Sequence, residues 1–203
     1  MKALYVTDRP AIGDSRFARV LASLAGLPSL RVELREKDTA DRESLAWAAG
    51  AREKLGPAVP LFVNRRFDLA LAAGADGVHL PADGLPLPRV RAGTPRGFRI
   101  GVSTHSLEEA EAAIAGGADL VVLGPIFDTP SKSAYGAPLG PEVLAGLPLL
   151  TEHDTEVYAI GGIDAAHVDE LEPYRDRISG VAAIRLFQEA ADPRAAAERI
   201  AAR

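Results

Sequence analysis

The feature that most constrains the fold is a regular alternation of short apolar runs with Ala-rich amphipathic stretches along the whole chain. The apolar runs predict strands and the amphipathic stretches predict helices, because side chains repeat about every 2 residues in a strand and about every 3.6 in a helix. Strands that alternate with helices in this way are parallel and joined by crossover helices. About eight such units favour a closed barrel over an open sheet.

The sequence therefore predicts an α/β fold, a (β/α)8 TIM barrel that forms one compact domain over residues 1–203. An open doubly wound sheet is the alternative, but no GxGxxG follows the first strand, which counts against its nucleotide-binding form. Strands are predicted at 4–6, 30–34, 59–63, 77–80, 100–103, 120–123, 157–160 and 180–184. Helices are predicted at 15–25, 39–55, 67–73, 87–92, 107–115, from 141, at 165–171 and at 193–202.

Composition and charge exclude several classes of function. The chain has no cysteine, which excludes disulfides, zinc–thiolate sites and cysteine nucleophiles. Its formal net charge is −5 and no block of like charge occurs, so neither a nucleic acid nor a membrane surface is an expected partner. No apolar run is long enough for a signal peptide or a membrane span. These observations predict a cytoplasmic protein.

A short repeat marks the start of two strands. Gly-Ala-Asp occurs at 74–76 and again at 117–119, each time between a predicted helix and a predicted strand. Glycine suits the left-handed residue that ends a helix. We interpret the repeat as structural, because such similarity is expected where one β/α unit recurs.

In a barrel of this kind, functional side chains lie at the C-terminal ends of the strands. Glu33, Arg35 and Lys37 alternate along the second strand and its end, so they face one side, predicted to be the barrel interior. Inward charges are costly unless they pair or bind something. We favour ligand binding, with an ion-pair network as the alternative.

Two further segments could hold an anion. Gly161 and Gly162 follow the seventh strand, where exposed backbone N–H groups suit a phosphate, and Ile184 and Arg185 follow the eighth. A tight turn is the alternative interpretation of the glycines. In the loop after the sixth strand, hydroxyls and an ammonium group could bind an anion, and a solvated loop is the alternative. These loop residues are Thr129, Ser131 and Lys132.

Histidines and acids were considered as proton carriers and metal ligands. His105 ends the fifth strand and is either a base or part of the cap of a helix that begins at Ser106. His79 has the same two interpretations, whereas His153 and His167 are expected on the surface. The acids at strand ends that could bind a metal are Asp8, Glu33, Asp83 and Asp128.

Several motifs in this order resemble the thiamine phosphate synthase / TenI family over nearly the whole chain. They are ELREKD (33–38), FVNRRFDLALAAGADGVHLP (62–81), IGVSTHSLEEAEAAIAGGADLVVLGPIFDTPSK (100–132), AIGGI (159–163) and ADP (191–193). The resemblance implies a (β/α)8 barrel in thiamine biosynthesis that binds a small phosphorylated thiazole at the strand ends, and it makes a homodimer plausible. The family includes a Mg²⁺-dependent synthase that releases pyrophosphate and a tautomerase that uses no metal.

Departures from the synthase pattern indicate the tautomerase branch. The pattern Gln-x-Arg-x-Lys has become Glu33-x-Arg35-x-Lys37, and the two metal-binding aspartates of the synthase correspond here to Arg65 and Gly84. Losing both carboxylates should abolish Mg²⁺ binding of that kind. The tautomerase's loop histidine, however, corresponds here to Pro125.

The resulting expectation is a metal-independent thiazole tautomerase-like isomerase without a cofactor, in which Glu33 and His105 are the candidate catalytic residues. The first alternative is a thiamine phosphate synthase with altered metal ligands, which would need Mg²⁺. The second is a non-catalytic binder or regulator of thiazole phosphate. The expected substrate-binding residues are Arg35, Lys37, Asn64, Ser103, Thr129, Ser131 and Lys132, and the expected phosphate-binding residues are Gly161, Gly162, Ile184 and Arg185.

Overall fold

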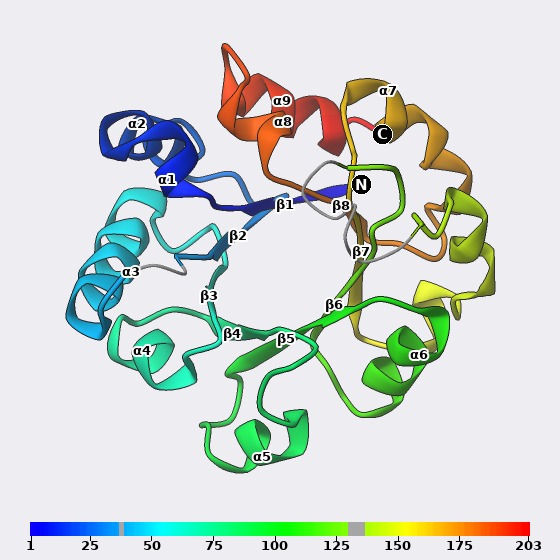
Figure 1. Ribbon diagram of the computed structural model, residues 1–203, viewed down its shortest axis with the longest axis horizontal. Helices are drawn as coiled ribbons and strands as arrows, with labels where there is room; N and C mark the ends of the chain where they lie inside the picture. Colours follow the sequence, from blue (N-terminus) through cyan, green and yellow to red (C-terminus); the bar gives the residue numbers. More distant parts are fainter. Residues whose placement is uncertain (37–38, 130–136) are drawn as a thin grey trace.

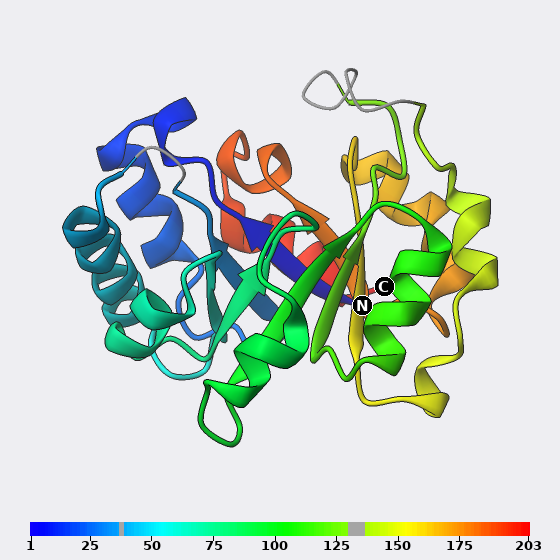
Figure 2. The same cartoon turned by 60° about the horizontal axis from the view of Figure 1, so that its bottom comes forward.

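Eight parallel strands form a closed barrel with the helices outside it, as predicted (Figure 1). The structure is a computed structural model that describes residues 1–36, 39–129 and 137–203. Each strand pairs with the next along the chain, and β8 closes the barrel against β1. The two chain termini lie close together in both views (Figure 1 and Figure 2).

The observed elements follow the predicted alternation closely. The strands are β1 (Lys2–Val6), β2 (Leu30–Leu34), β3 (Leu61–Asn64), β4 (Gly77–Leu80), β5 (Arg99–Thr104), β6 (Leu120–Leu123), β7 (Glu156–Ile160) and β8 (Gly180–Ala183). The α-helices are α1 (Arg9–Ile12), α2 (Asp14–Ser23), α3 (Asp41–Leu55), α4 (Phe67–Ala72), α5 (Leu87–Ala92), α6 (Leu107–Ala115), α7 (Ala165–Glu170), α8 (Arg185–Gln188) and α9 (Pro193–Ala201). Short 3₁₀ helices are η2 (Pro141–Gly146), η3 (Leu150–Glu152) and η4 (Glu172–Tyr174).

The sequence prediction is wrong in two respects. The α-helix expected from Pro141 is instead the 3₁₀ helices η2 and η3. Glycine and proline interrupt this stretch at Gly140, Gly146 and Pro148, which prevents a regular i to i−4 ladder. The one-turn helices α1 and α8 were not predicted, because four residues are too few to display a helical period.

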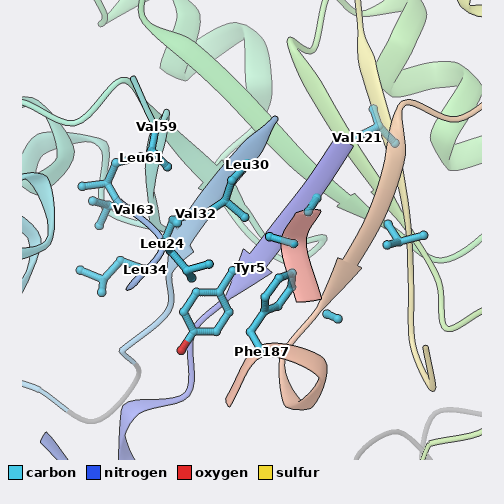
Figure 3. Packing of buried hydrophobic residues seen from close by; sticks show 14 of the residues in the cluster. Tyr5, Leu24, Leu30, Val32, Leu34, Val59, Leu61, Val63, Val121 and Phe187 are labelled. Atoms are coloured by element: carbon cyan, nitrogen blue, oxygen red, sulfur yellow. The ribbon is translucent and has the colours of Figure 1, made fainter. Parts of the chain in front are cut away.

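The strands bury both faces. Residues such as Tyr5, Val32 and Val63 point outward and pack against the helices in one large cluster (Figure 3). Tyr5 and Phe187 lie side by side in this layer, with ring centroids 5.3 Å apart. The alternate residues form a smaller cluster inside the barrel, namely Leu4, Val6, Phe62, Leu120, Val122, Tyr158 and Ala182. Side-chain alternation in each strand therefore separates two apolar layers.

An ion-pair network lies toward the N-terminal ends of the strands. Glu156 at the start of β7 accepts hydrogen bonds from Arg31 at 2.8 and 3.0 Å, from Lys2 at 2.6 Å and from the Tyr158 hydroxyl at 2.8 Å. Burial by itself would raise the pKa of Glu156, but these donors outweigh it and lower the pKa to about 2. The network joins β1, β2 and β7 across the barrel.

The Gly-Ala-Asp repeat has a structural role at both occurrences. Gly74 and Gly117 have φ of +67° and +80°, the left-handed conformation expected after a helix. Asp76 Oδ2 accepts from the N–H of Leu61 at 2.8 Å and from Arg52 at 2.6 Å. Asp119 Oδ2 has the equivalent bonds, from Ile100 N–H at 2.7 Å and from Arg91 at 2.6 Å. Each aspartate thus ties the start of its own strand to the preceding strand and to the helix before that strand.

We expect Asp119→Ala to lower the free energy of unfolding by about 1–3 kcal/mol, because the substitution leaves the N–H of Ile100 without its acceptor. Asp119→Asn retains an acceptor oxygen, so its free energy of unfolding should fall by less than that of Asp119→Ala. Urea denaturation of both variants checks this expectation, and equal losses would contradict it.

No helix in the described part of the chain is long and apolar enough to cross a membrane.

Candidate active site

Four polar side chains from consecutive strands meet inside the C-terminal mouth of the barrel. They belong to Glu33 in β2, Asn64 in β3, His79 in β4 and Ser103 in β5. Strand register explains their meeting, because Glu33 pairs with Phe62, Asn64 pairs with His79 and His79 pairs with Gly101. All four therefore occupy inward positions, as was predicted for Glu33.

Their contacts form a continuous chain. The Asn64 amide donates to Glu33 Oε1 at 2.9 Å, Glu33 Oε2 lies 3.8 Å from His79 Nδ1, and His79 Nε2 is 2.8 Å from Ser103 Oγ. Glu33 and His79 are almost completely buried, while Asn64 and Ser103 are partly exposed. The structure thus brings together three of the expected site residues, and it adds His79, for which the sequence left two interpretations open.

The remaining residues of the predicted charged series lie beyond β2. Arg35 is half-buried and its N–H donates to Thr7 Oγ1 at 2.9 Å. Lys37 lies outside the described residues. Glu36 was not among the expected site residues, yet its buried carboxylate accepts from Thr7 Oγ1 at 2.9 Å and from Arg9 Nε at 3.1 Å. The sequence indicated inward residues only by the alternation of Glu33, Arg35 and Lys37. Glu36 lies on the opposite face of that segment and was therefore not selected.

The glycines after β7 hold the loop that follows β6. Phe127 N–H donates to Gly161 O at 3.0 Å, and Ile126 N–H donates to Ile160 O at 2.8 Å. A Cβ on Gly161 would lie 2.6 Å from Pro125 Cα, and Gly162 has φ of +68°. The tight-turn interpretation therefore accounts for both glycines without a ligand. Among the described residues, the N–H groups of the two glycines donate no backbone hydrogen bond.

The other expected phosphate-binding residues lie at the end of the neighbouring strand. Ile184 caps the short helix α8, and Arg185 is its exposed first residue. Ile160 pairs with Ala182, so the ends of β7 and β8 are adjacent. Thr129 is buried at the end of the described part of the β6 loop, whereas Ser131 and Lys132 lie outside the described residues.

His105 lies next to the start of the same loop. Its ring Nδ1 is 2.7 Å from Gly124 O, and its backbone N–H donates to Glu109 Oε2 at 2.7 Å. Ser106 caps α6 by accepting from Glu109 N–H, so the helix-capping interpretation of this segment is confirmed. His105 is exposed and does not touch the Glu33 chain of contacts.

His153 and His167, which were expected on the surface, are both half-buried. Both ring nitrogens of His153 are buried, and the His167 ring packs on Phe127 with centroids 4.1 Å apart. His167 also lies 3.0 Å from Asp164 Oδ1, at the N-terminus of α7. It therefore helps to anchor the β6 loop, which no pattern in the sequence indicated.

In the described part of the chain, the carboxylates at the strand ends do not gather into a cluster of metal ligands. Over residues 1–36, 39–129 and 137–203, no group of three or more His, Asp or Glu side chains is arranged to hold an ion. Asp83 pairs with Arg65, Glu33 is bonded to Asn64, and Asp128 is exposed. Arg65 adopts φ of +65° directly after β3, and its guanidinium is the group that pairs with Asp83. Mg²⁺ requires oxygen ligands, usually one or two carboxylates with substrate phosphates.

The fold and the placement of these side chains define a TIM-barrel protein whose candidate site lies at the C-terminal mouth. The family model described as thiamine monophosphate synthase (TMP-TENI) matches residues 3–187. The chain belongs to this family, which confirms the resemblance seen in the sequence.

Relatives and solved structures agree with this membership. The chain is 41% identical over 190 residues to a thiamine-phosphate synthase of Methanoculleus marisnigri, covering 89% of this chain and 86% of the relative. It is 36% identical over 203 residues to a thiamine-phosphate synthase of Chloroflexus aurantiacus, and the match covers 98% of this chain and 91% of the relative. The structure of a thiamine phosphate pyrophosphorylase from Pyrococcus furiosus superposes with a TM-score of 0.81 at 28% sequence identity. The superposition covers 99% of this chain and 94% of the other.

Proposed function

We propose that this enzyme of thiamine biosynthesis joins a pyrimidine diphosphate to a thiazole phosphate and releases pyrophosphate. The observation that carries the proposal is the 41% identity to a relative named thiamine-phosphate synthase, over almost the whole barrel. The relatives therefore favour the synthase, which the sequence analysis held as the alternative, over the tautomerase that it preferred.

The proposed binding mode follows from the arrangement of the strand ends. The thiazole phosphate would be held by the free N–H groups of Gly161 and Gly162, with Ile184 and Arg185 beside them. The diphosphate would be held by Arg35 at the end of β2, with Asn64 and Ser103 as polar contacts inside the mouth. Thr129 remains a proposed contact, and Lys37, Ser131 and Lys132 are proposed from the sequence alone.

A specific observation favours a second candidate function, thiazole tautomerisation. Asp83 pairs with Arg65, and the described residues hold no preformed cluster of three or more metal ligands. A proton transfer needs no metal ion. The mouth holds the carboxylate of Glu33 and the imidazole of His79 in contact distance of each other.

One experiment separates the two candidates. Purified protein is given the pyrimidine diphosphate with thiazole phosphate, and separately the thiazole carboxylate phosphate, each with Mg²⁺ and with a chelator. Pyrophosphate release supports the proposed transferase. Isomerisation that is insensitive to the chelator, with no pyrophosphate release, would overturn it in favour of the tautomerase. Binding without either reaction would leave only the non-catalytic alternative.

Arg35→Ala should raise KM for the phosphorylated substrate by about 10- to 100-fold, because a charge-assisted hydrogen bond contributes about 1.5–3 kcal/mol. Arg42→Ala, which removes an exposed arginine from α3, is the matched control and should leave KM unchanged. Steady-state kinetics of both variants measure this effect. A KM for Arg35→Ala equal to that of Arg42→Ala would remove Arg35 from the site.

A further inference from the structure

The series of contacts inside the mouth has a defined direction from donor to acceptor. Asn64 donates its amide to one oxygen of Glu33, and the other oxygen faces Nδ1 of His79 at 3.8 Å. The oxygen is too far from Nδ1 for a direct hydrogen bond, but a carboxylate on that side favours the tautomer with its proton on Nδ1. Nε2 is then an acceptor, and Ser103 Oγ at 2.8 Å is the group that donates to it.

The barrel leaves space for this imidazole. A Cβ built on Gly101 of β5 would lie 2.7 Å from His79 Nδ1, so any larger residue at that position would displace the ring. Gly101 pairs directly with His79 in the sheet. The ring is thus fixed between β5, Glu33 and Ser103.

The exposure of these side chains indicates which end of the series of contacts meets a ligand. Glu33 and His79 are 3% and 2% exposed, whereas Ser103 is partly exposed. The hydroxyl therefore stands between the open mouth and the buried imidazole. This order, with a hydroxyl, an imidazole and a carboxylate in succession, is the arrangement that lets a base act on a hydroxyl.

We infer that Ser103, His79 and Glu33 form a proton relay, in which Ser103 exchanges a proton with the bound ligand and His79 is its base. The ligand's proton passes to Ser103 Oγ while the proton of Ser103 passes to His79 Nε2. The imidazolium that forms is stabilised by the Glu33 carboxylate, and the reverse transfer returns the proton. The inference rests on the proposed binding of a phosphorylated heteroaromatic ligand at this mouth, and it assigns His79 as a positioning residue and base that the sequence analysis did not select.

The tautomer of His79 tests the relay without any substrate. The chain has four histidines, so long-range ¹H–¹⁵N spectra of the imidazoles are simple, and the resonance that responds to Ser103→Ala identifies His79. We expect a protonated Nδ1 and an accepting Nε2 in the unmodified protein. Glu33→Gln should weaken this preference, and Gly101→Ala should disturb it by displacing the ring. A proton found on Nε2 would overturn the inference, because His79 would then donate to Ser103.

Kinetics supply the second test, with whichever substrate the assay above shows to be turned over. Ser103→Ala should lower kcat by about 100-fold, as expected for lost proton transfer, in addition to any rise in KM from the lost polar contact with the ligand. Ser23→Ala on α2 is the control and should change neither. A raised KM with unchanged kcat would overturn the relay and leave Ser103 as a binding contact. If no substrate is turned over, the proposed function fails while the tautomer measurement still decides the hydrogen-bond order.

Discussion

Glu156→Ala is expected to lower the free energy of unfolding by about 3–5 kcal/mol. The substitution leaves the cations of Lys2 and Arg31 without the carboxylate that both contact, and breaking a buried pair costs that much because an uncompensated charge remains. Arg31 is 8% exposed, so water cannot replace the lost oxygen easily. Chemical denaturation at neutral pH measures the loss.

The same network predicts a pH dependence. The pKa of Glu156 falls from 4.5 to about 2 on folding, so its contribution is complete above about pH 4.5 and is lost as the pH falls toward 2. A shift of this size corresponds to about 3 kcal/mol. The unmodified protein should therefore lose more stability between pH 5 and pH 2 than Glu156→Gln, whose side chain does not titrate.

A matched control separates this network from ordinary surface pairs. Glu198→Ala breaks an exposed i,i+4 pair with Arg194 on α9 and should cost less than about 1 kcal/mol. A loss for Glu156→Ala as small as that of Glu198→Ala would show that the network does not stabilise the barrel. Parallel pH curves for the unmodified protein and Glu156→Gln would contradict the assigned pKa.

Hydrophobic alternation was sufficient to predict the barrel. Five elements, the strands at 30–34, 77–80 and 120–123 and the helices at 87–92 and 107–115, have the predicted bounds, because an apolar run or an amphipathic stretch is a local property of the chain. The segment after β6 could not be predicted in the same way. Its apolar residues suggest a helix, but Gly140 and Gly146 shorten it to 3₁₀ turns.

The site was only partly predictable, because its geometry depends on pairing between strands. Alternation along β2 placed Glu33 inside the barrel, and the structure agrees. The contact of His79 with Ser103 depends on the register of β4 against β5, which no local pattern reports. The network at Glu156 likewise joins residues that are 125 positions apart, so sequence spacing gives no indication of it.

Gly162→Ala is expected to detach the loop after β6 from the end of β7. At φ of +68° an alanine is strained by about 1–2 kcal/mol, and its Cβ would also lie 2.8 Å from Phe127 Cβ and against Asp128 O. The backbone of that loop would have to move away. Because the loop packs on the glycines proposed to hold phosphate, binding of thiazole phosphate should weaken by more than about 10-fold, which corresponds to about 1.4 kcal/mol.

Gly74 provides a control with almost the same backbone. Its φ is +67°, but nothing lies within 4 Å of a built Cβ, so Gly74→Ala suffers the conformational strain alone. It should lose about 1–2 kcal/mol of stability and bind the ligand normally. The difference between the two variants in thermal unfolding and in calorimetric binding therefore reports the close approach of the loop. Equal losses of stability with normal binding in both would mean that the loop adapts, and that its contact with Gly162 does not shape the mouth.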